Sequence, residues 1–564
     1  MASPANESEP MERIWLSSYE KSVPKDVEIP DITLIDLIDT TLTEYRSKPA
    51  FHCMGATITY DKLDQYSREM AAYFQEKLGL KPGDRLAIML PNILQYPVAL
   101  FAALRAGLTV VNVNPLYTAR ELKHQLKDSG AETIVIAANF AHTLAEVMDD
   151  TPVKNVVTTQ LGDLLGFPKS LIVNFVVKFV KKMVPPFSIP SATTFNEVLG
   201  QGAGLNYTKP KLDGEDLAFL QYTGGTTGVS KGAMLCHRNL ISNIYQARAW
   251  IESRVKKGEE IIVTPLPLYH IFSLVANCFT FSSIGGANVL IPNPRDMDGF
   301  VKELKKWPFT AFTGVNTLFN GLLAHPEFRN CDFSNLSVTL GGGMAVQKYV
   351  ADEWKKTTGA PMIQAYGLTE TSPAASINPF NQPEFNGSIG LPISNTYISI
   401  RDDDGKEVTH GEPGEIWIKG PQVMKGYWQR PEETKKVLTD DGWLKTGDVA
   451  TMADDGYVTI VDRKKDMILV SGFNVYPNEI EDVICMHEGV LEAAAIGVED
   501  AKTGEAIKVF VVKKEASLTK EQLIEHCRGS LTGYKVPKNF EFRDDLPKTN
   551  VGKILRRALR ESAS

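Results

Sequence analysis

The chain has 564 residues, of which 43% are hydrophobic and 23% are charged, and its formal net charge is −8. This length exceeds what one hydrophobic core normally organises, so we expect two or more domains. The acidic balance excludes a global attraction to nucleic acid, and any anionic ligand must therefore be held by a local arrangement of residues.

The sequence offers no candidate for a secretory leader or a membrane span. Its first fifteen residues lack a basic start followed by an apolar run, and no stretch of about 18 apolar residues occurs. The six cysteines are scattered, without C-x-x-C spacing and without histidines at metal-ligand spacing. We therefore expect a cytoplasmic protein with free thiols.

In the first part of the chain, predicted strands alternate with predicted helices. The expected helices span residues 60–82, 96–107 and 140–148, and the expected buried strands span residues 85–91, 131–137 and 217–222. The first helix is closed by Gly79 and then Pro82. Apolar runs of strand length that alternate with amphipathic helices predict parallel sheets in an α/β architecture.

Residues 171–184 are predicted to form an apolar helix with a narrow basic stripe. Asn174, Lys178, Lys181 and Lys182 fall at positions i, i+4, i+7 and i+8. About fourteen residues are too few to span a bilayer, but such a helix can lie among lipid headgroups, with its lysines on anionic lipid. We therefore expect peripheral contact with the cytoplasmic face of the inner membrane. A core helix with snorkelling lysines and a homodimer contact are the alternatives.

The stretch after the predicted strand 217–222 is the most informative. It reads Thr223-Gly224-Gly225-Thr226-Thr227-Gly228-Val229-Ser230-Lys231-Gly232. Glycines let backbone amides approach an anion, threonine hydroxyls add donors, and Lys231 adds a positive charge. We therefore expect this loop to bind nucleotide phosphates. It differs from a Walker A loop because Ser230 precedes the lysine and Gly232 follows it, which disfavours P-loop kinases and GTPases.

Two further glycine motifs occupy residues 340–344 and 364–371. The glycines of the first would let a flat base lie against the backbone, although glycine turns after strands are common. In the second, an aromatic beside a glycine suits base stacking, and a carboxylate four residues later suits a hard cation such as magnesium. An ordinary surface carboxylate is the alternative. The candidates in these motifs are Gly342, Gly343, Met344, Tyr366, Gly367, Thr369 and Glu370.

The pattern of the sequence changes near residue 394. Short alternating segments at 396–408 and 414–420, separated by Asp-Gly and Pro-Gly turns, predict a smaller β-rich unit. A last section follows with strands at 490–498 and 507–514. It continues with a helix from Thr519, where Gln522 gives capping-box spacing. We expect a domain boundary near residues 462–465.

Motifs with candidate functional residues lie on both sides of this boundary. Asp448 stands in Thr-Gly-Asp, which alone is usually a turn, and Arg463 stands in Asp-Arg-Lys-Lys. Near the end, Pro-Lys-Thr-Asn-Val-Gly-Lys closes on Lys553. A lysine so near a terminus is normally exposed and unimportant. However, a lysine ammonium is a compact charge suited to offsetting the repulsion between two anions.

Taken together, these motifs resemble the adenylate-forming superfamily, which includes acyl-CoA synthetases, luciferases and peptide-synthetase adenylation domains. The resemblance runs from about residue 33 to residue 557, with the motifs in the family's order. It implies a large N-terminal AMP-binding domain over residues 1–462, with α/β subdomains, parallel sheets and a β-rich subdomain over 394–462. It also implies a hinge at 463–465, pivoting at Lys465, and a small mobile α+β C-terminal domain over 466–564.

The resemblance also assigns roles to the candidate residues. It implies that Tyr366 stacks on adenine, Thr369 contacts phosphate and Glu370 helps to hold magnesium. It implies that Asp448 accepts hydrogen bonds from the ribose hydroxyls and that Arg463 approaches the ribose and phosphate. Lys553 matches the catalytic lysine of the family, with Lys231 as a second cation. The implied ligands are ATP, Mg²⁺, coenzyme A and an organic acid.

The segment 265–272, Pro-Leu-Pro-Leu-Tyr-His-Ile-Phe, is apolar with one histidine. By resemblance it lines the acyl pocket and places His270 near the reacting carboxylate, although a packed core histidine fits the same pattern. In the segment 313–317, Gly314 and Val315 are further pocket candidates, because a glycine beside small residues would leave room for an alkyl tail. The preferred chain length cannot be read from such a pattern.

The resemblance predicts an ATP-dependent ligase that joins a long-chain fatty acid to coenzyme A through an acyl-AMP intermediate. The block 440–466 resembles fatty acyl-CoA synthetases, and the chain is similar to bacterial long-chain fatty acid–CoA ligases in length and in the 171–184 insertion. The open alternatives are a medium-chain or aromatic acid–CoA ligase, an amino-acid-activating domain and a light-emitting relative. A different class is a non-catalytic fatty-acid-binding or uptake protein, but the retained Lys231, Glu370 and Lys553 favour catalysis.

Overall fold

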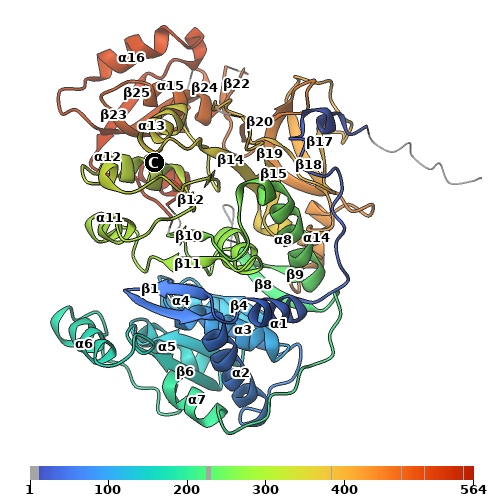
Figure 1. Ribbon diagram of the computed structural model, residues 1–564. Helices are drawn as coiled ribbons and strands as arrows, with labels where there is room; N and C mark the ends of the chain where they lie inside the picture. The colour runs from blue at the N-terminus through green and yellow to red at the C-terminus, as the bar shows by residue number, and fades with distance from the viewer. Residues whose placement is uncertain are drawn as a thin grey trace, which may run out of the picture.

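The computed structural model describes residues 12–223, 230–382, 384–471, 473–500, 502–549 and 552–563. Among these residues the strands form four sheets, and the unit at the C-terminal end of the chain lies at the top of the molecule (Figure 1). The fold is the predicted α/β architecture with parallel sheets, a β-rich part and a small α+β C-terminal domain.

The first sheet has seven strands in the order β7-β6-β5-β3-β4-β8-β9, parallel except for the β8–β9 hairpin. Its strands are β3 (Arg85–Met89), β4 (Thr109–Asn112), β5 (Thr133–Ala137), β6 (Asn155–Thr159), β7 (Thr193–Thr194), β8 (Leu217–Thr223) and β9 (Lys231–Cys236). The accompanying helices are α1 (Leu34–Glu44), α2 (Tyr60–Glu76), α3 (Gln95–Arg105), α4 (Ala119–Ser129), α5 (Ala141–Val147), α7 (Phe195–Gly202) and α8 (His237–Ile251). The predicted strand–helix alternation is confirmed because apolar runs such as β3 and β5 are buried on both faces of the sheet.

The second sheet has nine strands in the order β16-β15-β14-β13-β12-β10-β11-β1-β2, with a parallel centre. Its strands are β1 (Pro49–Cys53), β2 (Ala56–Thr59), β10 (Ile261–Thr264), β11 (Ala287–Leu290), β12 (Ala311–Gly314), β13 (Val338–Gly341), β14 (Ile363–Gly367), β15 (Ala374–Ile377) and β16 (Leu391–Pro392). Its helices include α9 (Ile271–Ser273), α10 (Thr280–Ser282), α11 (Met297–Leu304), α12 (Asn316–Ala324) and α13 (Lys348–Thr358). The parallel centre places the carboxyl ends of β12, β13 and β14 at one edge.

The third and fourth sheets follow in the C-terminal third of the chain. The third is antiparallel and consists of β17 (Tyr397–Arg401), β18 (Gly414–Lys419), β19 (Leu444–Met452) and β20 (Val458–Arg463), with α14 (Pro431–Val437) beside it. The fourth consists of β21 (Ile468–Val470), β22 (Phe473–Val475), β23 (Val490–Asp500), β24 (Gly504–Lys513) and β25 (Asn539–Arg543), with α15 (Pro477–Cys485), α16 (Lys520–Arg528) and α17 (Arg556–Ala563). The capping box predicted at Thr519 and Gln522 forms at the start of α16.

The predicted helix over residues 171–184 is wrong at its C-terminal end. The structure has α6 (Lys169–Phe175) followed by a π-helical turn, η3 (Val176–Val180), and Lys182 adopts a left-handed backbone with φ of 50°. Asn174 is also not part of a basic stripe. It accepts a hydrogen bond from the Gly162 amide at 2.7 Å and donates one to Asp163 at 3.0 Å. Lys181 and Lys182 therefore lie beyond the last helical residue, Val180, and do not continue a helical stripe.

In Figure 1 the α6 segment projects from the body of the molecule at the lower left. Within the part of the chain that the structure describes, no helix combines the length and apolar character needed to cross a membrane.

Candidate active site

The carboxyl ends of the parallel strands β12, β13 and β14 meet at one edge, which is where ligands bind in open α/β sheets. At Gly367 another backbone segment lies very close: a Cβ atom there would lie 1.8 Å from the Pro373 carbonyl oxygen. At Gly342 a Cβ would lie 3.1 Å from the Ala365 carbonyl oxygen. The two glycines therefore permit close backbone packing beside the edge, and Met344 packs partly buried against the neighbouring core.

Gly314 and Val315 lie at the end of β12, but the space at Gly314 is already filled. A Cβ there would lie 2.8 Å from the Phe319 ring, so the missing side chain accommodates that ring and leaves no open channel at this point. Val315 is buried. Its methyl groups face Gly343 and Gly552, the residue before Lys553.

Lys553 reaches this edge from the C-terminal domain. Its Cε lies 3.5 Å from where a Cβ of Gly343 would be. The lysine sits in a closed turn, in which its amide donates to the Thr549 hydroxyl at 3.0 Å and Lys548 bridges Ile554. Burial, reinforced by the positive charge of Arg463, lowers the pKa of Lys553 to about 8, although Asp448 and Glu370 act in the opposite direction.

Asp448, Arg463 and Tyr366 form a polar cluster beside this lysine. Pairing of β19 with β20 places Asp448 opposite Arg463, and the Arg463 Nε lies 3.2 Å from Asp448 Oδ1. The Tyr366 hydroxyl, at the end of β14, donates to Asp448 Oδ2 at 2.7 Å. The Asp448 side chain is buried, so its charge is balanced by these two partners. Burial and the neighbouring carboxylate raise the pKa of Tyr366 well above its ordinary value.

Glu370 and Lys231 both contact Tyr427, and Lys231 also pairs with Glu433; the sequence reasoning missed both partners. Glu370, in the 3₁₀ turn η7 (Thr369–Thr371), accepts a hydrogen bond from the Tyr427 hydroxyl at 2.6 Å. Lys231 lies over the Tyr427 ring, 5.0 Å from its centroid, and pairs with Glu433 at 2.5 Å. The hydrogen bond from Lys231 lowers the pKa of Glu433 to about 2. Tyr427 and Glu433 belong to the stretch Gly-Tyr-Trp-Gln-Arg-Pro-Glu-Glu, whose clustered aromatic and acidic residues were the available signal.

Most of the predicted phosphate loop, Gly224 to Val229, lies outside the described residues. Its two ends are placed. Thr223 ends β8 and is paired in register with Lys231 at the start of β9. The ends of the loop therefore meet in a hairpin, and Lys231 points toward the Glu370–Tyr427 pair.

His270 precedes α9, and its Nδ1 accepts a hydrogen bond from the Phe272 amide at 3.3 Å. Burial, assisted by the nearby charge of Lys553, lowers the pKa of His270 to about 3, so the imidazole is neutral near pH 7. The carbonyls of the preceding loop accept hydrogen bonds from buried side chains of the first part of the chain. These bonds are Asn92 to Leu266, Tyr96 to Leu268 and Gln221 to Tyr269, at 2.9, 2.8 and 2.7 Å. The loop is thereby fixed beside Lys553.

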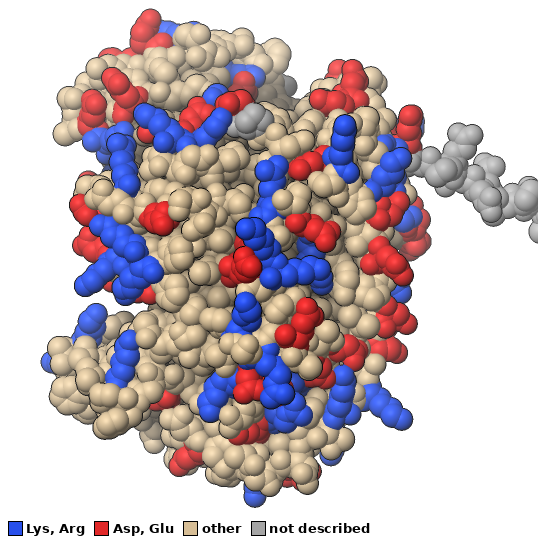
Figure 2. Space-filling view, in the orientation of Figure 1, with Lys and Arg blue, Asp and Glu red and all other residues tan. Residues whose placement is uncertain are grey.

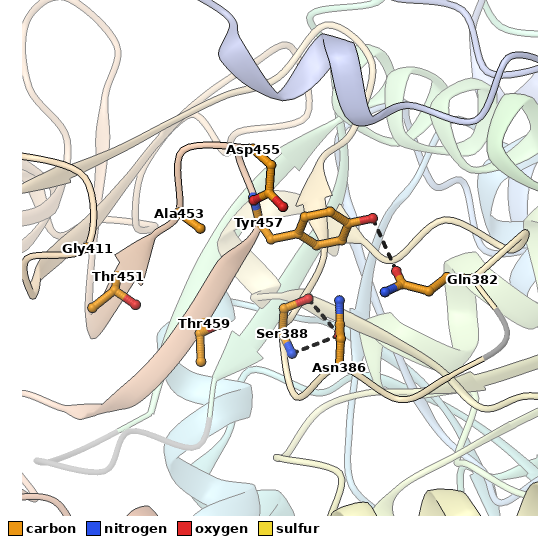
Figure 3. A pocket seen from close by; sticks show the side chains of 9 residues that line it. All are labelled: Gln382, Asn386, Ser388, Gly411, Thr451, Ala453, Asp455, Tyr457 and Thr459. Atoms are coloured by element: carbon orange, nitrogen blue, oxygen red, sulfur yellow. Dashed lines mark hydrogen bonds between the residues drawn. The ribbon is translucent and has the colours of Figure 1, made fainter.

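Lys465 follows the end of β20 and is exposed, whereas its neighbour Lys464 pairs with Asp403 at 2.5 Å. A separate depression of about 320 Å³ lies elsewhere, between the β19–β20 turn and the loop before β16 (Figure 3). There the Tyr457 hydroxyl donates to Gln382 Oε1 at 3.1 Å. Among the described residues that line it, none is a predicted site residue.

Comparison with known proteins agrees with this geometry. The AMP-binding enzyme family matches residues 38–428, and the AMP-binding enzyme C-terminal domain matches residues 479–553. A long-chain-fatty-acid–CoA ligase of Yersinia pestis is 57% identical over 98% of both chains. One of Escherichia coli O6:H1 is 56% identical over 98% of this chain and 99% of its own.

A solved structure of similar fold is that of ATP-bound MatB from Rhodopseudomonas palustris. It has a TM-score of 0.81, is 29% identical, and covers 94% of this chain and 99% of its own. The family models, the relatives and this fold lead to one assignment: the chain belongs to the AMP-binding enzyme family.

Proposed function

We propose that this protein is an ATP-dependent ligase that joins a long-chain fatty acid to coenzyme A through an acyl-AMP intermediate. The observation that carries the proposal is the placement of Lys553 over Gly343, near the charged groups of Asp448, Arg463 and Glu370. The names of relatives that are 56–57% identical support the long-chain substrate. A medium-chain or aromatic acid–CoA ligase is the alternative within the same chemistry.

In this proposal the nucleotide spans the strand edge. The loop from Thr223 to Gly228, with Lys231, binds the phosphates, and Thr369 contacts them from η7. Adenine lies between the glycine segment 342–344 and the Tyr366 ring, and the ribose hydroxyls donate to Asp448. The 2.7 Å hydrogen bond from Tyr366 to Asp448 supports a joint adenine–ribose site, because it places the ring and the carboxylate side by side.

Glu370 is the proposed ligand of Mg²⁺. Its carboxylate offers hard oxygen donors, and the Tyr427 hydrogen bond engages only Oε1, so the residues present fit the ion. Bound Mg²⁺ would neutralise phosphate charge. Glu433 pairs with Lys231 at 2.5 Å, and we propose that the triphosphate takes the place of that carboxylate when ATP binds.

The proposed chemistry has two steps. A carboxylate oxygen of the fatty acid attacks the α-phosphorus of ATP and forms an oxygen–phosphorus bond. The bond from the α-phosphorus to the oxygen that bridges to the β-phosphate breaks, and pyrophosphate leaves. Lys553 and Lys231 stabilise the negative charge that accumulates as the two anions meet. The C-terminal domain, residues 466–564, then turns about the hinge 463–465 at Lys465 and removes Lys553. The thiol of coenzyme A attacks the acyl carbonyl, loses its proton, and AMP leaves.

Acyl-CoA formation by the purified protein tests this function. The reaction contains ATP, Mg²⁺, coenzyme A and one acid, and mass spectrometry measures acyl-CoA and AMP. The acids are fatty acids of rising chain length, benzoate and an amino acid. Equal amounts of acyl-CoA and AMP from long-chain acids support the proposal. Preference for benzoate favours the aromatic ligase, and fatty-acid binding without any product favours a binding or uptake protein.

The projecting segment α6–η3 is the proposed membrane contact. Phe175 and Phe179 are 58% and 59% exposed, and Lys169, Lys178 and Lys181 lie in the same segment. Figure 2 shows this projection as mostly uncharged surface with separate basic side chains. Apolar residues flanked by lysines fit the headgroup layer of an anionic membrane better than water.

Vesicle sedimentation tests the membrane contact. The wild type should sediment with phosphatidylglycerol vesicles and less with phosphatidylcholine vesicles, and Phe175→Ser with Phe179→Ser should abolish sedimentation. Leu116→Ser removes a 54% exposed leucine elsewhere and should change nothing. If the wild type does not bind vesicles but forms a dimer, and the double variant is a monomer, the segment is a homodimer contact instead.

A further inference from the structure

Helix α12 of the large domain contacts the C-terminal domain next to Lys553. In Figure 1 the C-terminal domain rests on α12 and α13 at the top of the molecule. Two side chains on one face of α12, Thr317 and Asn320, are three positions apart and both reach across to it.

Both contacts end on backbone carbonyls of the C-terminal domain. The Thr317 hydroxyl donates to the Gly552 carbonyl at 3.1 Å, and the Asn320 amide donates to the Leu491 carbonyl, in β23, at 3.2 Å. A carbonyl direction is fixed by the backbone, so these two bonds depend on the position of the whole domain. They restrict the orientation of the domain more than contacts with long, flexible side chains would.

Gly552 is the residue next to Lys553, and its packing against α12 is close. It adopts φ of 81°, and a Cβ there would lie 2.9 Å from the Thr317 hydroxyl and 3.2 Å from Val315. The turn that carries Lys553 is thus seated directly on the start of α12. Holding the Gly552 carbonyl fixes the point from which the lysine extends toward Gly343.

A further contact between the C-terminal domain and the large domain involves Lys514 and Tyr349. The ammonium of Lys514 lies 5.7 Å from the centroid of the Tyr349 ring, on α13. At that distance it contributes little. Of the α12 pair, the Thr317 bond joins the lysine turn to the large domain, and the Asn320 bond joins β23 of the same C-terminal domain to it.

We propose that Thr317 and Asn320 are positioning residues that select the adenylation orientation of the C-terminal domain and place Lys553 for that step alone. The inference rests on the proposed function, in which Lys553 acts in adenylation and is withdrawn before the thioester forms. Withdrawal of Lys553 carries the Gly552 carbonyl away from Thr317. Both bonds thus stabilise the domain orientation used for adenylation, and both must break before the thioester forms.

The test separates the two half-reactions in the full-length protein. ATP–pyrophosphate exchange with palmitate measures adenylation, and conversion of synthetic palmitoyl-AMP to palmitoyl-CoA measures the thioester step. The variants are Thr317→Val, Asn320→Ala, their combination, and Thr317→Ser, which keeps the hydroxyl. Thr43→Val, an exposed threonine in α1, is the matched control, and thermal unfolding monitors the fold of each variant.

We expect Thr317→Val and Asn320→Ala each to lower exchange about fivefold, because each loses one neutral hydrogen bond. The double variant should lose on the order of 20-fold. Thr317→Ser and Thr43→Val should keep wild-type exchange. Thioester formation from palmitoyl-AMP should be unchanged or faster in every variant, a separation that a general loss of stability would not produce.

Two results would overturn the inference while leaving the proposed function intact. One is full exchange in the double variant when Lys553→Ala has lost exchange. The other is an equal fall of both half-reactions in Thr317→Val, which would make the contact merely structural. If Lys553→Ala itself retains exchange, the proposed role of the lysine is wrong. That result concerns the proposed function and does not depend on the α12 variants.

Discussion

Adenylation should slow as the pH rises through about 8, because Lys553 must be protonated to stabilise the meeting of two anions. Burial and Arg463 lower the pKa of Lys553 to about 8, against the opposing influence of Asp448 and Glu370. Its folded pKa lies below the ordinary lysine value, so the ammonium is present below pH 8 and lost above it. His270, which also lies near Lys553, has its pKa lowered to about 3 and stays neutral between pH 7 and 9.

The size of the effect follows from a single titration. With a pKa of about 8, about ten-elevenths of the lysine is protonated at pH 7 and about one-eleventh at pH 9. Adenylation should therefore fall about tenfold between these two values, which corresponds to ~1.4 kcal/mol in apparent barrier. The pKa of about 8 applies to the enzyme without nucleotide, because bound triphosphate favours the protonated lysine and raises its pKa.

The assay is kcat/KM for ATP in pyrophosphate exchange between pH 6.5 and 9.5, since this ratio reports groups of the free enzyme. Lys553→Arg is the matched variant, because its guanidinium stays charged over the whole range. It should be slower at pH 7 but lose the alkaline decline. A flat wild-type profile to pH 9.5, or the same decline in Lys553→Arg, would refute the reasoning.

Three further predictions use other parts of the site. Gly367→Ala should lower the free energy of unfolding by about 3 kcal/mol in urea, since its Cβ would lie 1.8 Å from a carbonyl oxygen. Gly200→Ala, with open space around it, should be neutral or stabilising. Equal free energies of unfolding for the Gly367→Ala and Gly200→Ala variants would contradict this account. Glu433→Gln should lower the KM for ATP in exchange kinetics by releasing Lys231, whereas Lys231→Gln should raise it; an unchanged KM in Glu433→Gln would count against the pairing. His270→Gln should reduce kcat without altering the pH profile between 5 and 7, and loss of an acid limb in that range would show that His270 titrates there.

Local patterns in the sequence were sufficient for much of the fold. The apolar runs at 85–91 and 131–137 could be predicted as strands because buried parallel strands need apolar residues on both faces. The capping box at Thr519 could be predicted because it depends on residues only three positions apart. The convergence of Gly342, Gly343 and Gly367 follows from glycine motifs placed after neighbouring parallel strands.

The remaining features depend on contacts between distant residues or on local backbone detail. Tyr427 bonds Glu370 across 57 residues, and Glu433 pairs with Lys231 across 202, so no local pattern contains either contact. The space at Gly314 is filled by a ring five residues along, which composition alone does not reveal. The helix predicted to reach residue 184 ends at Val180, because a π turn and a left-handed Lys182 interrupt a run that still looks helical by periodicity.

ATP–pyrophosphate exchange across fatty acids of rising chain length, with Lys553→Ala alongside, tests the central claim most directly. The account predicts exchange that rises to a maximum with a long-chain acid and collapses in Lys553→Ala. Absence of exchange with every fatty acid, or full exchange in Lys553→Ala, would contradict it.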